Sequence, residues 1–124
     1  MALGLSLCNL VIVDQDTRMP SLVGLFTGLE VDRFPSDPQR FSVFAALSSG
    51  RGNGKIELVS TWLNTDEPIY SKTGVVSFPD PLTVVNAIFR VRTIVFPEPG
   101  NYEFALFVDG DMIARCRLRV YKPE

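Results

Sequence analysis

The sequence contains no histidine, only two cysteines and a single tryptophan. Without histidine, Ser-His-Asp and Cys-His catalysis, the HExxH zinc site and imidazole-based pH switches are all excluded. Cys8 and Cys116 lie near opposite ends of the chain and form no CxxC pair, so a zinc centre is unsupported. We expect two buried free thiols, although neighbouring terminal strands would leave a bridge between them open. We therefore predict neither a metal nor a cofactor.

Excess charge and long apolar runs are also missing. The 124 residues include 12 Lys and Arg against 14 Asp and Glu, a net charge of -2. A chain with that balance is not built to hold nucleic acid by bulk electrostatics. The first apolar run ends at Asp14, well short of the roughly 20 residues that a membrane helix needs, and no Lys or Arg precedes it as in a secretory signal. We expect a soluble cytoplasmic protein with neither a membrane nor a nucleic-acid partner.

The residues that are abundant indicate an all-β domain. Hydrophobic residues make up 46%, enough for one core over residues 1–124, and turn-forming residues recur about every ten positions. The predicted principal strands cover residues 5–13, 21–31, 41–47, 55–63, 82–96, 101–108 and 112–121, with shorter ones at 68–72 and 75–78. About seven principal strands predict an antiparallel two-sheet β-sandwich, with a closed barrel as the alternative.

The segment from Glu98 to Phe104 resembles the corner between two strands of immunoglobulin-like domains. In that corner a glycine allows a tight turn and a tyrosine bonds back to the upstream backbone, roles that fall here on Gly100 and Tyr102. Phe104 stands where those domains carry a disulfide cysteine. The fold class that we predict is therefore an immunoglobulin-like sandwich without the disulfide.

A wider resemblance covers nearly the whole chain. The stretches 11–14, 21–26, 34–35, 99–104 and 108–110 are similar to those of an uncharacterised family of small bacterial single-domain β-sandwich proteins. The resemblance implies the fold and a stand-alone bacterial cytosolic protein. It carries over no functional residues.

Two sets of arginines are candidate partner-binding residues. Arg115, Arg117 and Arg119 alternate along the last strand, so period two places their side chains in a row about 7 Å apart. Arg90 and Arg92 form a shorter row. Such rows favour an acidic protein or another anionic ligand, whereas the structural alternative is a solvated face that protects an edge strand.

Strands that are apolar on both faces indicate a covered second surface. Ala105 and Phe107 alternate with Phe104 and Leu106, whereas a sandwich strand normally keeps one wet face. Ala105 and Phe107 are therefore predicted oligomer contacts, unless a long loop covers them.

These patterns favour a non-enzymatic protein-interaction module or a self-associating module. In the second case the partner is a further copy of the chain, in a homo-oligomer. One alternative is a carbohydrate-binding module that stacks sugar rings on Trp62 and Tyr70. A second alternative is an enzyme built on carboxylates, although the sequence identifies no catalytic pair. Clustered carboxylates at one end of the sandwich could also hold Ca²⁺, but no calcium-loop spacing is present and carboxylates in turns are the ordinary outcome; these acids are Asp14, Asp16, Glu30, Asp32 and Asp37.

Overall fold

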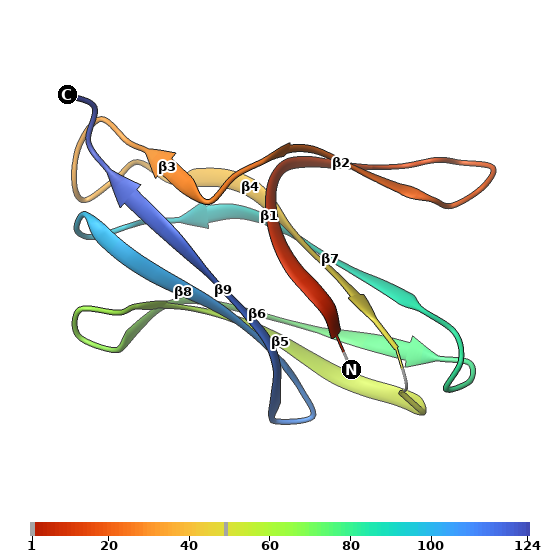
Figure 1. The fold of residues 1–124 in the computed structure, drawn as a ribbon. Coiled ribbons are helices and arrows are strands. Elements are labelled where there is room, and N and C mark those ends of the chain that lie inside the picture. Colours follow the sequence, from red (N-terminus) through yellow and green to blue (C-terminus); the bar gives the residue numbers. More distant parts are fainter. Residues whose placement is uncertain (1, 49) are drawn as a thin grey trace.

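A computed structural model describes residues 2–48 and 50–124, which form nine strands (Figure 1). Their bounds are β1 Ala2–Val13, β2 Pro20–Leu25, β3 Gly28–Glu30, β4 Gln39–Leu47, β5 Gly52–Trp62, β6 Glu67–Phe78, β7 Val85–Ile94, β8 Gly100–Val108 and β9 Asp111–Tyr121. The prediction of an all-β chain is confirmed. The structure has nine strands, where the sequence predicts about seven principal strands and two shorter ones.

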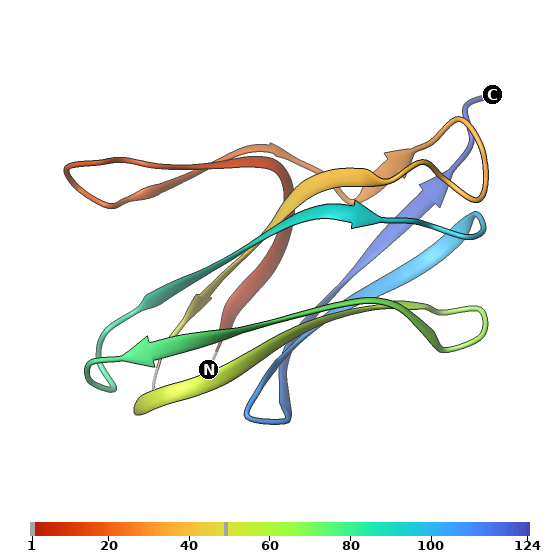
Figure 2. The same ribbon diagram turned by 180° about the vertical axis from the view of Figure 1, so that it is seen from behind.

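The strands form two sheets that face each other (Figures 1 and 2). The first sheet has the order β2-β1-β4-β7, and the second has the order β3-β9-β8-β5-β6. All pairs are antiparallel except β3 with β9, which is parallel. The second sheet is therefore mixed, and the expectation of a purely antiparallel sandwich is wrong at this pair.

The mixed pair arises because the predicted strand 21–31 is broken between the sheets. β2 belongs to the first sheet and β3 to the second. At the crossing, the Phe26 amide donates to the Leu7 carbonyl of the first sheet, and the Arg119 amide of the second sheet donates to the Thr27 carbonyl. The Phe26 ring turns toward the interior and meets Phe41 edge to face, with centroids 5.5 Å apart. Burial of this ring favours the crossing over one continuous strand.

Two further predicted boundaries differ. The short strands 68–72 and 75–78 are one strand, β6, which continues through Gly74. β7 begins at Val85 rather than at residue 82, because Asp80 holds a turn before it. The Asp80 carboxylate accepts hydrogen bonds from the Leu82 amide and the Thr83 hydroxyl. Such an Asp side chain offers the backbone an alternative to the strand ladder.

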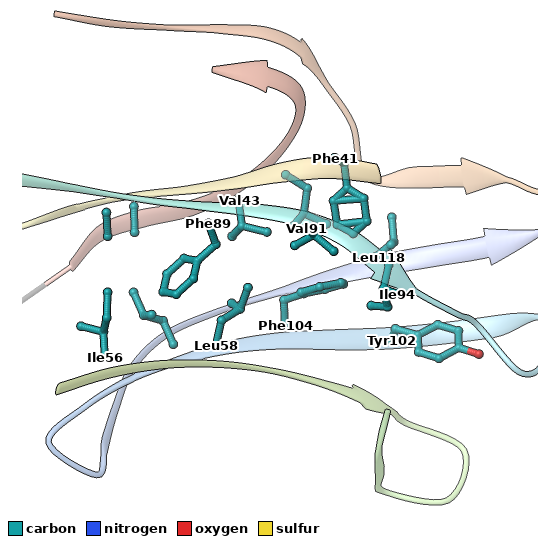
Figure 3. Close-up of a cluster of buried hydrophobic side chains, with 14 of the residues drawn as sticks. Phe41, Val43, Ile56, Leu58, Phe89, Val91, Ile94, Tyr102, Phe104 and Leu118 are labelled. Carbon is teal, nitrogen blue, oxygen red and sulfur yellow. The ribbon is translucent and has the colours of Figure 1, made fainter. Parts of the chain in front are cut away.

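The core lies between the sheets (Figure 3). Phe41 and Val43 of β4 face Leu58 of β5 and Phe104 of β8, and all four are buried. The Phe41 and Phe104 rings meet edge to face at 5.8 Å, so the two sheets contact through a pair of aromatic rings. Edge-to-face contact adds stability beyond the apolar area that it buries.

β1 pairs with different strands along its length. Its first part pairs with β4 as far as Cys8, and its second part, from Cys8 to Val13, pairs with β2. The hairpin formed by residues 9–25, here called the arm, consequently extends beyond the rest of the sandwich in both views (Figures 1 and 2). The arm is thus a two-stranded ribbon at one margin of the first sheet.

Candidate functional site

The predicted corner is built around a buried tyrosine. Tyr102 is fully buried, and its hydroxyl donates to the Glu98 carbonyl at 2.5 Å while the Glu98 amide donates back to the hydroxyl at 3.3 Å. Burial raises the pKa of Tyr102. Gly100 has φ of 140°, and a Cβ there would lie 3.3 Å from Nε1 of Trp62. The corner is thus a structural feature that holds β8 against the core.

Arg115, Arg117 and Arg119 all project from the outer face of β9 and are exposed. Two of them already have neighbours in the chain. The Arg115 guanidinium lies 3.9 Å from the Glu103 carboxylate, and Arg119 lies 5.0 Å from the centre of the Tyr121 ring. Of the three arginines, Arg115 therefore has a charge partner in its own sheet, and Arg119 lies over a ring of its own strand.

Arg90 and Arg92 lie on the other side of the molecule. Both are exposed on β7, where they alternate with buried Phe89 and Val91, and so they belong to the outer face of the first sheet. The structure does not bring the two arginine sets together. It instead adds Arg40 of β4 to Arg90 and Arg92, and the three line one shallow hollow of about 360 Å³.

Sequence reasoning missed Arg40, because its neighbours in the chain form no alternating row of arginines. Only the pairing of β4 with β7 places it near Arg90 and Arg92. No signal along the sequence relates residues that are 50 positions apart in this way.

Ala105 and Phe107 lie on the outer face of the second sheet. Ala105 is 6% exposed, whereas Phe107 is half-buried. Their cross-strand neighbours on β5 are Val59 and Glu57. The role of these two residues as oligomer contacts stays a prediction.

The most exposed apolar cluster lies on the arm, where sequence reasoning placed no site. Leu10 pairs with Val23 across the hairpin, and each is 44% exposed. Ile12 is 52% exposed and Leu25 64% exposed. A continuous apolar strip therefore follows one face of the arm, and alternation along β1 and β2 was the signal that could have revealed it.

The two aromatic residues proposed to stack on sugar rings are both half-buried. The Trp62 ring stacks on Tyr102 at 6.4 Å with an angle of 22° between the planes, so one face of the indole is occupied by the core. Tyr70, on β6, is half-buried, and burial raises its pKa. Trp62 and Tyr70 are both partly buried against the core, so each exposes only part of its ring.

The acidic residues separate into two places. Asp14 lies at the tip of the arm, where its carboxylate accepts hydrogen bonds from the Asp16 and Thr17 amides. Those bonds lower the Asp14 pKa. Glu30, Asp32 and Asp37 line a different hollow of about 160 Å³ together with Arg33, which pairs with Asp37 at 2.5 Å. Within residues 2–48 and 50–124, no group of three or more acidic or cysteine side chains is arranged to hold a metal.

Both thiols are free. Cys8 is fully buried on the first sheet, and burial raises its pKa. Cys116 faces an apolar hollow of about 310 Å³ beside Leu5 and Phe26. Burial raises the Cys116 pKa to about 11, and the nearby Glu103 charge adds to the shift. Thiols with raised pKa values are poor nucleophiles at neutral pH.

Residues 4–121 match the model of a protein family of unknown function, DUF6941, and the chain belongs to this family. No curated protein matches the chain. Among the helices of the described residues, none is long and apolar enough to cross a membrane.

Proposed function

We propose that this protein is a non-enzymatic interaction module that associates with a second copy of itself through the edge strand β2. The observation that carries this proposal is the lack of any charge on an exposed apolar edge. Two copies of β2 running antiparallel about a two-fold axis would join two four-stranded sheets into one.

A comparison of the four sheet edges singles out β2. The edge strands are β2 and β7 in the first sheet, and β3 and β6 in the second. β7 carries Arg90 and Arg92, β6 carries Lys72, and the three-residue β3 carries Glu30. Proteins use such charges and short lengths to prevent edge-to-edge pairing. β2 carries no charge, and none occurs from residue 19 to residue 29.

The side chains of the arm would add apolar contact to the backbone pairing. β1 also has no charged residue. On one face of the arm, Leu10 and Ile12 of β1 lie beside Val23 and Leu25 of β2, and all four are exposed. Removal of this apolar strip from water would contribute about 25 cal/mol for each Å² covered. The same strip on a second copy supplies a surface of matching chemistry.

The strand order supports the immunoglobulin-like likeness. The order β1-β4-β7 in one sheet and β5-β8-β9 in the other corresponds to the A-B-E and C-F-G arrangement of that architecture. The tyrosine bond of Tyr102 to Glu98 adds to the likeness. A bacterial cytoplasmic protein is consistent with the family resemblance and with two free thiols.

A non-enzymatic role is favoured by the state of the acidic groups. The pKa values of Asp14 and Asp80 are lowered by hydrogen bonds, whereas a general acid needs a raised value. The carbohydrate alternative is weaker, because one face of the Trp62 ring packs on Tyr102 and is not open to a sugar.

Mass in solution, measured by light scattering over a dilution series, tests the proposal. We expect the native chain to form a dimer that dissociates on dilution, and Val23→Lys to be a monomer at every concentration. The Lys would introduce two like charges across the two-fold axis and restore the edge protection that β2 lacks.

Val75→Lys is the matched control, since Val75 is 77% exposed on the opposite edge strand β6. This variant should keep the mass of the native chain. A native chain that is monomeric throughout, or a Val75→Lys chain that dissociates while Val23→Lys does not, would overturn the proposal.

A further inference from the structure

The hollow that Arg40, Arg90 and Arg92 line on the outer face of the first sheet has no role in self-association through β2. Asn9 of β1 and Ser42 of β4 complete its polar lining. All three arginines and Asn9 are exposed, whereas Ser42 is only 4% exposed and lies on the floor. The chain carries a net charge of -2, so this positive hollow runs against the overall balance.

Strand pairing brings these residues together. Ser42 lies directly opposite Arg90, and Phe41 lies opposite Val91. The register then shifts, because Gln39 pairs with Ile94. Arg40 therefore faces the two residues Arg92 and Thr93, as in a β-bulge. Arg92 lies opposite Arg40 because it follows Val91 just as Arg40 precedes Phe41, and Thr93 is the extra residue that lets Gln39 pair with Ile94.

The donors in this hollow are unused. Among residues 2–48 and 50–124, Arg40, Arg90 and Arg92 form no ion pair, and the side chains of Asn9 and Ser42 form no hydrogen bond. Like charges facing each other across strands destabilise a sheet. This cost would be relieved by one anion placed among the three guanidiniums.

We propose that the hollow binds the phosphate group of a small ligand, with the three guanidiniums as its charge partners and Ser42 and Asn9 as neutral donors. Three positive charges match a phosphate dianion better than a single carboxylate, and the guanidinium fork pairs with phosphate oxygens in a bidentate manner. The volume of about 360 Å³ lies within the range of small-molecule sites.

A small ligand fits better than a nucleic acid. Phe41 contributes to the hollow but is buried in the core, so no ring is open for base stacking. The positive charge is also confined to one hollow of an acidic protein, whereas a polyanion needs a longer positive track.

The test is a titration of the ¹⁵N-labelled chain with inorganic phosphate, followed by NMR, against sodium chloride at matched ionic strength. We expect saturable shifts at the amides of Asn9, Ser42 and their neighbours on β7. Arg90→Gln and Arg92→Gln should each weaken phosphate binding at least about tenfold, since each removes one charge-assisted pair. Ser42→Ala should weaken it by a smaller factor.

Arg117→Gln is the matched control, because Arg117 is exposed on the opposite outer face. It should leave phosphate binding unchanged. Glycerol phosphate then separates the sources: tighter binding than inorganic phosphate indicates a phosphate ester, and equal binding indicates the free ion. The proposal would be overturned if the chemical shifts do not saturate with phosphate, or if Arg117→Gln loses as much phosphate affinity as Arg90→Gln and Arg92→Gln. It would also be overturned if the hollow binds an acidic peptide in place of phosphate. None of these outcomes depends on the dimer.

Discussion

At the residue scale, Tyr102 shows how far a local motif can be read. The pattern from Glu98 to Tyr102 predicts a tyrosine bonded to upstream backbone, and the hydroxyl does donate to the Glu98 carbonyl at 2.5 Å. The motif is readable because all of its partners lie within five residues of each other. Arg40 is the opposite case, since its partners on β7 are distant in the chain.

Removal of the Tyr102 hydroxyl tests the corner directly. Tyr102→Phe should lower the free energy of unfolding by about 1 kcal/mol, since it deletes the bond to Glu98 but keeps the buried ring. Urea denaturation followed by tryptophan fluorescence measures the change. Tyr70→Phe is the control, because the Tyr70 hydroxyl has no hydrogen bond within the described part of the chain. Equal urea midpoints for the native chain and Tyr102→Phe would show that the corner bond does not stabilise the fold.

At the scale of elements, β2 and β3 form the part of the fold that the sequence predicts least well. Residues 21–31 show a continuous strand pattern, yet the chain crosses from one sheet to the other at Phe26. The crossing depends on where the Phe26 ring can be buried, and Phe41 supplies that place from another strand. Strand patterns report which residues are apolar and do not report which sheet receives them.

Gly24 of β2 is constrained by its backbone conformation and by its neighbour on β1. Its φ is 70°, and a Cβ there would lie 3.0 Å from Cβ of Asn9. Gly24→Ala should therefore destabilise the protein by about 1–3 kcal/mol, through backbone strain and through this contact. Thermal or urea unfolding measures the loss.

Gly52→Ala separates the two causes. Gly52 has a similar φ of 64°, but a Cβ there would meet nothing within 4 Å. The Gly52 variant should thus lose less stability than the Gly24 variant. Equal losses would show that strain alone explains both.

At the scale of the whole molecule, aromatic side chains from the two sheets pack against each other in the core. Phe104 of the second sheet is fully buried and meets Phe41 of the first. The outer faces are separate surfaces, with Arg115, Arg117 and Arg119 on one and Arg90 and Arg92 on the other. The fold thus places on opposite faces the two rows of arginines that the sequence identifies.

Phe104→Ala should cost about 3–5 kcal/mol, because it opens a cavity where the sheets meet. We expect circular dichroism and fluorescence to report one shared transition at a lower denaturant concentration, since both sheets depend on this contact. Phe107→Ala is the control on the outer face of the same strand, and its cost should be smaller because Phe107 is half-buried. A larger cost at Phe107 than at Phe104 would reverse the assignment of the faces of β8.

The sequence by itself determined the properties that depend on near neighbours. These are the all-β class, the tyrosine corner and the outward arginines of β9, because alternation and turn chemistry act over a few residues. The tertiary structure alone decided which sheet receives β3, which edge is left without charge, and that Arg40 joins Arg90 and Arg92. The physical reason is that these outcomes depend on pairing between distant strands, which is selected by burial of side chains such as Phe26 against residues elsewhere in the chain.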